Sequence, residues 1–187
     1  ITLKKSSIIS AYTETEDGRR SPMVRTAVYK LKDDMDITME CNYNPQYNAR
    51  GNRGLIDGLR GSVNWKTGGW QGYQNTDFIA VHDLRGERRL TTFGSGYCQD
   101  ARSWIWMPTS VEYYVSDNGI DYTKVGEVEN SVDPKDYTIQ VDDFVLNTNP
   151  VKAKFVKVVA KNFGTIPDWH LGAGGKAFIF IDEIWVE

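Results

Sequence analysis

Residues 110–129, "SVEYYVSDNGIDYTKVGEVE", decide the fold class. Two short runs rich in β-branched and aromatic residues flank a turn signal, and neither run has helical periodicity. Asn118-Gly119 is a strong hairpin signal, because Asn and Gly accept the positive φ that tight hairpin turns demand. We therefore predict antiparallel strands over residues 110–116 and 122–128.

The same kind of run recurs along the whole chain, and turn residues separate the runs. The other predicted strands cover residues 8–13, 24–31, 37–41, 78–84, 90–97, 137–141, 155–161 and 177–185. Many short strands at this spacing are typical of an all-β antiparallel sandwich.

The first part of the chain differs in composition from the rest. Residues 1–33 carry interspersed charges and one hairpin-like break at residues 16–21. We interpret them as the tail of a preceding small β domain, or as an N-terminal pairing arm, joined through residues 32–36 to a main domain of residues 34–187. The alternative is that these strands belong to the main sandwich. Because the chain starts at Ile1 without a signal peptide, we expect it to be a piece of a longer protein.

Composition excludes several classes of protein. The chain has 187 residues and a net charge of -3 without a basic block, which argues against nucleic acid as a partner. No apolar run reaches the roughly 18 residues of a membrane span, so we expect no membrane insertion. Cys41 and Cys98 could form one disulfide or remain two buried thiols. Two distant His and no CxxC argue against structural zinc. The unusual feature is the aromatic content, with six Trp and ten Tyr.

The segment "GLIDGLRGSVNW", residues 54–65, indicates a cation site. Asp57 and Ser62 bracket a glycine-bearing loop, and such a loop turns backbone carbonyls inward, where a hard cation collects oxygen ligands. Asp182 and Glu183 interrupt the most apolar strand, where a charge is costly unless it is paired or bound to metal. Taken alone, Asp57 is more often a turn residue and Glu183 more often faces solvent. Together they favour Ca²⁺.

Several motifs in order carry a family resemblance. They are "YNARGNRGLIDGLRGSVNWKTGGWQGY", "DFIAVHDL", "YCQDARSWIWMPTSVEYYVSDNGIDY" and "AKFVKVVAKNFGTIPDWHLGAGGKAFIFIDEI", within about residues 40–187. The chain resembles a discoidin-like, coagulation factor type C domain, and among these the family 32 carbohydrate-binding modules. It is most similar to the C-terminal modules of Bacteroidetes β-hexosaminidases and chitobiases of glycoside hydrolase family 20.

The resemblance implies a galactose-binding-domain-like jelly-roll sandwich with a structural Ca²⁺. The implied metal ligands are the carboxylates of Asp57 and Glu183, the hydroxyl and carbonyl of Ser62, and the carbonyls of Gly54, Leu59 and Asp182. Ser62 stands where the family usually has Thr. The resemblance also implies a periplasmic or cell-surface location.

The sugar-binding face in such modules is built from loops at one end of the sandwich. An aromatic ring stacks on the C–H face of a saccharide, while polar side chains bond its hydroxyls. The candidates are Trp169 and His170 first, then Trp104, Asp100, Gln99, Arg102, Trp70, Tyr73 and Asn162, where Asn162 either orients its loop or bonds sugar. We expect Trp106 and Trp185 in the core and Trp65 in packing.

Catalysis by this chain is not expected. Asp77, Asp100 and Asp168 form no recognisable carboxylate pair, and no GxSxG motif occurs. The leading hypothesis is a non-catalytic module that targets a linked glycoside hydrolase to glycan. The Arg and Asn that the resemblance implies for galactose-binding members are missing at residues 97–99 and 104–105, which argues against galactose. By analogy with the hexosaminidase context, N-acetylglucosamine or a host-glycan fragment fits better. The alternative is a structural sandwich that packs on the catalytic domain or a partner and binds no sugar.

Overall fold

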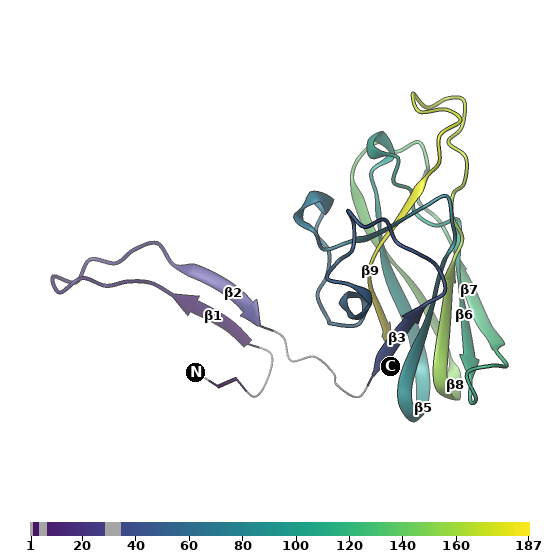
Figure 1. Cartoon of the computed structure of the whole chain (residues 1–187), viewed down its shortest axis with the longest axis horizontal. Coiled ribbons are helices and arrows are strands. Elements are labelled where there is room, and N and C mark those ends of the chain that lie inside the picture. Colours follow the sequence, from purple (N-terminus) through teal and green to yellow (C-terminus); the bar gives the residue numbers. More distant parts are fainter. Residues whose placement is uncertain (1, 4–6, 29–34) are drawn as a thin grey trace. The chain divides into compact units, whose positions relative to one another are not determined.

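β1 (Ser7–Ala11) and β2 (Val24–Val28) pair antiparallel and form a two-stranded sheet of their own (Figure 1). The computed structural model describes residues 2–3, 7–28 and 35–187, and the chain divides into two compact units, residues 1–32 and 33–187. The turn of the hairpin contains Gly18, whose positive φ of 83° suits glycine. Part of the predicted strand 24–31, part of the predicted linker 32–36 and the predicted boundary after residue 33 lie outside the described residues.

The second unit is built from seven strands and three short 3₁₀ helices. They are β3 (Asp36–Met39), η1 (Asn52–Leu55), η2 (Trp65–Thr67), β4 (Gln71–Gln74), β5 (Phe78–Gln99), η3 (Ala101–Ser103), β6 (Ser110–Ser116), β7 (Thr123–Glu129), β8 (Gln140–Ala160) and β9 (Phe178–Val186). The hydrogen-bonded order is β4-β9-β5-β8-β6-β7, with β3 on the free side of β5.

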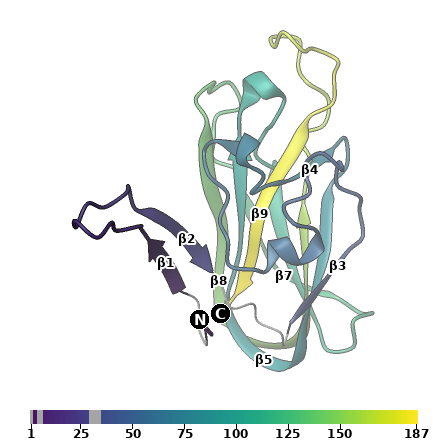
Figure 2. The same ribbon diagram turned by 60° about the vertical axis from the view of Figure 1, so that its left-hand side comes forward.

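β5 and β8 are long enough to take part in both layers of the sandwich (Figure 2). The first part of β5 pairs with β3 and with residues 155–160 of β8, which continue to β6 and β7. After register shifts, the second part of β5 pairs with residues 140–147 of β8 and with β9, which carries β4. Each long strand therefore passes from one sheet to the other, and the predicted all-β jelly-roll sandwich is confirmed.

The core lies between the two layers. Its largest fully buried side chains are Tyr73, Tyr97, Tyr113, Phe78, Phe93, Leu55, Leu84 and Met107. Trp70, Ile105 and Phe180 form a second buried cluster, and Trp106 belongs to a third. The Ser95 hydroxyl satisfies polar groups inside this core, because it bonds both Tyr97 and Tyr113. Cys41 and Cys98 are free thiols, so of the two alternatives the unbonded one is observed.

Some predicted strand boundaries are wrong. The predicted strand 137–141 begins only at Gln140, because Asp136 accepts hydrogen bonds from the amide and hydroxyl of Thr138 and holds the preceding residues in a turn. Residues 71–74 form β4, where we expected a loop. The predicted strands 78–84 and 90–97 are one continuous strand. No helix in the described part of the chain is long and apolar enough to cross a membrane.

One end of the sandwich gathers three loops. Gln99 pairs with Gln140, Ser110 with Glu129, and Phe78 with Ala160, so residues 100–109, 130–139 and 161–177 leave the strands at the same end (Figure 1). We call this end the apex.

Candidate functional site

Two tryptophan rings are exposed at the apex. Trp104 is 38% and Trp169 40% exposed, and they come from two different apex loops. Trp104 ends η3 in a left-handed conformation with a φ of 66°, and the bridge between Asp100 and Ile105 closes this loop. These indoles are the predicted ring platforms that remain accessible to a ligand.

The glycines of the last loop make room for one of these rings. A β-carbon at Gly172 would lie 2.5 Å from the Trp104 indole nitrogen, and one at Gly175 would lie 3.1 Å from the same ring. The amide of Ile166 bonds the Gly175 carbonyl at 2.9 Å, which closes the loop that presents Trp169. The glycine run therefore lets backbone lie directly against an aromatic side chain.

His170 is placed differently from our expectation. Its ring is only 5% exposed, so the prediction that it is an exposed ligand contact beside Trp169 is corrected. It lies parallel to Tyr137 at 5.8 Å and edge-on to Trp106 at 5.2 Å. Its Nδ1 accepts the Gly172 amide hydrogen at 2.9 Å, so the neutral ring carries its proton on Nε2. His170 supports the loop from inside.

Three other sugar-binding candidates are buried. Trp70 is 1% exposed, and Tyr73 and Gln99 are 0% exposed. The prediction that these side chains contact a ligand directly is therefore corrected. The Trp70 indole donates to the Ser62 carbonyl, and the Tyr73 hydroxyl donates to Gln71. The Gln99 amide donates to the carbonyls of Asp133 and Asp136, which holds the 130–139 loop to β5. Their polar atoms are used to build the fold.

Asp100 and Arg102 belong to the same turn but face different surroundings. Asp100 is 7% exposed, and one of its oxygens accepts hydrogen bonds from the indole of Trp65 at 3.0 Å and from Ser103 at 2.7 Å. Arg102 is exposed, and its guanidinium carbon lies 5.9 Å from the ring centroid of Tyr137. Arg102 is therefore a candidate contact, while Asp100 fixes the shape of the turn.

Asn162 anchors the last loop. Its side-chain nitrogen donates to the Thr76 carbonyl at 3.1 Å and, over 3.4 Å, to the carbonyls of Tyr73 and Ala177. Its side-chain oxygen accepts the Gly164 amide at 2.7 Å. Of the two roles considered for Asn162, these contacts favour orienting the loop.

The 130–139 loop contributes residues that sequence reasoning missed. Tyr137 is half-buried against His170, and the Lys135 ammonium lies 5.6 Å from the ring centroid of Trp169. The turn residues "DPKD", 133–136, were the available signal for an exposed loop here. Only the tertiary contact shows that this loop reaches Trp169.

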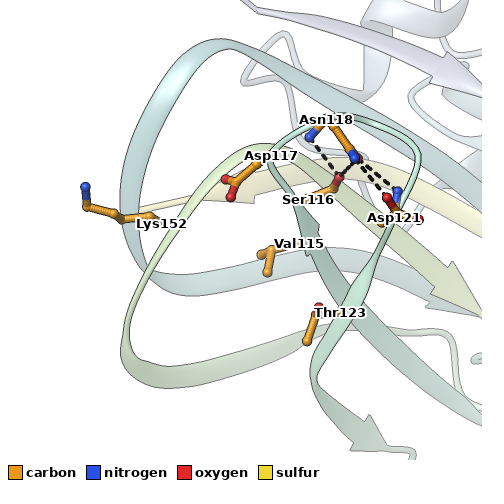
Figure 3. Close-up of a pocket in the computed structure, with 7 residues that line it drawn as sticks. All are labelled: Val115, Ser116, Asp117, Asn118, Asp121, Thr123 and Lys152. Carbon is orange, nitrogen blue, oxygen red and sulfur yellow. Dashed lines mark hydrogen bonds between the residues drawn. The ribbon is translucent and has the colours of Figure 1, made fainter.

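The cavity drawn in Figure 3 lies at the opposite end of the sandwich. It has a volume of about 380 Å³ and is lined by Val115, Ser116, Asp117, Asn118, Asp121, Thr123 and Lys152. Asn118 uses its oxygen to close the β6–β7 turn, accepting the amides of Ile120 and Asp121. None of the described residues that line this cavity is aromatic, so they offer no stacking surface like that of the apex.

Comparison with known proteins places this geometry in context. No protein-family model and no curated protein sequence matches the chain. A family 32 carbohydrate-binding module of Clostridium perfringens, solved with GalNAc-β-1,3-galactose, has a TM-score of 0.52 at 21% identity and covers 82% of this chain and 94% of its own. A Bacteroides thetaiotaomicron fragment assigned as a chitobiase has 0.54 at 13% identity, covering 83% and 89%. The family 32 module of AlyQ, solved with 4,5-unsaturated mannuronic acid, has 0.51 at 8% identity, covering 81% and 93%.

The chain has the fold of the discoidin-like family 32 carbohydrate-binding modules. The structural matches each cover more than four-fifths of the chain, and they agree with the resemblance read from the motifs.

In this module, two of the predicted calcium ligands meet beside the 57–59 turn. Glu183 accepts the Gly58 amide at 2.9 Å, and Asp57 accepts the Leu59 amide at 2.8 Å. The second carboxylate oxygen of Glu183 is buried without a hydrogen-bond partner among the described residues. Burial raises the pKa of Glu183 to about 8, and the nearby Asp57 adds to the rise. A cation would supply the missing partner of Glu183, so this carboxylate fits a Ca²⁺ ion. Asp57 already pairs with the guanidinium of Arg50 at 2.8 Å, so it would have to exchange this ion pair for the metal.

Other predicted calcium ligands fit less well. The Ser62 hydroxyl donates to the Asn64 carbonyl at 3.1 Å, and the Ser62 carbonyl accepts the Trp70 indole at 3.0 Å. Both oxygens of Ser62 are therefore used within the fold. Gly54 is buried against the Ala49 carbonyl. Across the described ranges, no group of three or more His, Cys, Asp or Glu side chains is arranged to hold a metal.

The Asp182 side chain faces a cation of the chain itself. Arg60 donates to Asp182 at 2.9 Å, also contacts Asp143, and lies 5.2 Å from the ring centroid of Trp185. A β-carbon at Gly96 would lie 2.2 Å from the Arg60 guanidinium. Gly96 of the "FGSGY" segment is therefore required by the close approach of this ion network.

Proposed function

We propose that residues 34–187 form a non-catalytic carbohydrate-binding module that holds a linked glycoside hydrolase on its glycan. The observation that carries this proposal is the pair of exposed indoles, Trp104 and Trp169, fixed at one end of a rigid sandwich. An exposed ring face matches the C–H face of a sugar, and nearby polar groups match its hydroxyls. Weak binding of this kind raises the local concentration of a linked enzyme at its substrate.

The ligand class is a further part of this proposal, and the sugars bound by similar modules support it. Solved modules of this fold include complexes with GalNAc-β-1,3-galactose and with an unsaturated mannuronic acid. For this chain we propose a glycan that contains N-acetylhexosamine or galactose, bound in the periplasm or at the cell surface. The linked catalytic domain would be a β-N-acetylhexosaminidase or chitobiase, as the motif resemblance implies.

A glycan array tests the binding function. Trp169→Ala and Trp104→Ala should each lose most of the retention shown by the parent, because each removes a stacking surface. Ile120→Ala is the matched control, since Ile120 is 80% exposed at the opposite end of the same unit. Equal retention by all four proteins would contradict the proposed site.

A structural role without sugar binding is the competing function. Leu171, at the tip of the last loop beside Trp169, is fully exposed at 105%, and an exposed apolar tip also suits a protein interface. If neither the parent nor the Ile120→Ala variant binds any glycan on the array, packing against the catalytic domain or a partner becomes the better explanation.

We also propose that Asp57 and Glu183 hold a structural Ca²⁺, with the carbonyls of Leu59 and Asp182 as further ligands. A bound ion raises the free energy of unfolding by an amount that grows with the logarithm of the ratio of ion concentration to dissociation constant. The melting temperature should therefore fall in EDTA and recover in CaCl₂, and Glu183→Gln should abolish the difference. Identical melting of the parent in EDTA and CaCl₂ would contradict the calcium site.

The β1–β2 hairpin is proposed to be the tail of a preceding small β domain. An isolated two-stranded hairpin is marginally stable in water. Among the described side chains of this unit, Tyr12, Met23 and Val24 are 44%, 52% and 70% exposed, so these apolar groups lack cover in the chain as it stands. Deleting residues 1–33 should leave the melting temperature of the second unit unchanged. A large drop would instead place these strands in the main sandwich.

A further inference from the structure

A row of three aromatic rings with a cation at each end crosses the apex. The Arg102 guanidinium lies 5.9 Å from the Tyr137 ring centroid, and Tyr137 lies parallel to His170 at 5.8 Å. His170 meets Trp169 edge-on at 5.9 Å, and the Lys135 ammonium lies 5.6 Å from the Trp169 ring centroid. We call these five residues the apex row. It joins all three apex loops.

Within the described residues, the two cations of the apex row have no counter-ion. Elsewhere on the module, the head groups of Arg50, Arg60 and Lys124 each meet a carboxylate within 3 Å. Arg102 and Lys135 contact rings, and no carboxylate among the described residues lies within ion-pair distance of either. A cation held over a ring stays available to an anion that approaches from solvent, because the ring does not neutralise its charge.

The carboxylates nearest to the apex row are already engaged by neutral donors. Asp100 accepts from Trp65 and Ser103. Asp136 accepts from Thr138 and Gln140. Asp133 accepts the Lys135 backbone amide at 2.8 Å. Asp168, exposed beside Trp169, is the one apex acid in the described part of the chain without such a bond. These bonds leave the carboxylates charged but use their oxygens within the fold, so Arg102, Lys135 and Asp168 are the charged groups beside the rings that remain open to a ligand.

We propose that the apex binds an acidic saccharide, a glycan whose carboxylate or sulfate group is bound by Arg102, with Lys135 as a second attracting charge, while its ring stacks on tryptophan. This inference rests on the proposed carbohydrate-binding function and specifies its ligand. A guanidinium offers paired N–H donors that match two oxygens of a carboxylate or sulfate, and charge-assisted bonds of this kind are about twice as strong as neutral ones. Lys135 adds a mobile point charge at the other end of the row.

Calorimetric titration of the whole chain with three matched ligands tests the proposal. Chitobiose is the neutral ligand, a hyaluronan disaccharide brings a carboxylate, and 6-O-sulfated N-acetylglucosamine brings a sulfate. At least one acidic ligand should bind about tenfold more tightly than chitobiose, which corresponds to about 1.4 kcal/mol. The acidic ligand that binds more tightly shows whether the site prefers a carboxylate or a sulfate. The preference should shrink as NaCl is raised from 50 to 500 mM, because salt screens exposed charges.

Charge variants locate the effect. Arg102→Gln and Lys135→Gln should each weaken binding of the acidic ligand several-fold and change chitobiose binding less than twofold. Lys154→Gln is the matched control, because it removes the same charge from an exposed position of β8 at the end away from the apex. It should leave both affinities unchanged.

The outcomes separate this inference from the proposed function. If Trp169→Ala abolishes binding while acidic and neutral sugars bind equally in the parent, carbohydrate binding stands and the acidic ligand is overturned. If no sugar binds at all, both are overturned. A surface of aromatic rings flanked by cations would also suit single-stranded nucleic acid. Binding of a (dT)12 oligonucleotide in preference to every sugar would overturn the acidic-glycan proposal as well.

Discussion

Trp104 rests on Gly172 so closely that a β-carbon there would come within 2.5 Å of the indole nitrogen. Gly172→Ala should therefore displace the Trp104 ring without unfolding the sandwich. We expect a loss of glycan binding of roughly tenfold, a change in tryptophan fluorescence, and a stability cost within the usual range of about 1–3 kcal/mol for overpacking. Ala173→Gly, in the same loop, is the control. Unchanged binding by Gly172→Ala would show that the position of Trp104 does not matter.

Asn162 should affect binding without touching the ligand. Asn162→Ala removes the side-chain bonds to the Thr76 carbonyl and the Gly164 amide, and leaves buried backbone groups unsatisfied. A lost buried hydrogen bond of this kind costs about 1–3 kcal/mol. We expect faster amide hydrogen exchange in residues 163–177 together with weaker glycan binding. Asn162→Asp retains only the hydrogen-bond acceptor, so its amide exchange and glycan binding should lie between those of the parent and those of Asn162→Ala. Parent-like exchange in Asn162→Ala would disprove the anchoring role.

Arg60 and Asp182 form the ion pair whose loss should be most costly. Asp182 is fully buried, so Arg60→Met leaves its carboxylate without a cation. Breaking a buried pair costs about 3–5 kcal/mol. Because the Arg60 side chain is 41% exposed, solvent screens part of this interaction and we expect roughly half of that cost in the free energy of unfolding. Adding Asp182→Asn should recover part of the loss. If the destabilisation of the double variant equalled the sum of the two single variants, direct coupling between Arg60 and Asp182 would be contradicted.

The Cys98 thiol should be inert in the folded protein. Burial raises its pKa from 9.0 to about 12, so almost no thiolate forms at pH 8. A thiol-reactive dye should label the Cys41→Ala variant only after unfolding in guanidinium. The pKa of the Cys98 thiol is higher in the folded state than in the unfolded state. The contribution of the protonated thiol to the free energy of unfolding is therefore complete below about pH 9 and is lost as the pH rises toward 12. Rapid labelling of native Cys41→Ala at pH 8 would contradict this burial.

Sequence patterns anticipated the layers but not the continuity of the long strands. The hairpin at residues 110–129 and the apolar run before the C-terminus are local signals, because alternation and turn chemistry act over a few residues. The passage of β5 and β8 from one sheet to the other occurs at register shifts near Arg88 and Thr92. Such irregularities depend on pairing with distant strands, so no local pattern revealed them.

The sequence by itself determined the all-β class, the likeness to a carbohydrate-binding fold, and the loops in which functional aromatics had to be sought. Only the tertiary structure decided which rings face solvent. Trp70 and Trp104 both lie in glycine-bearing or polar segments, yet Trp70 is 1% and Trp104 38% exposed. The physical reason is that the accessibility of a ring depends on which distant segment covers it. The local pattern of the sequence around the ring does not reveal that segment.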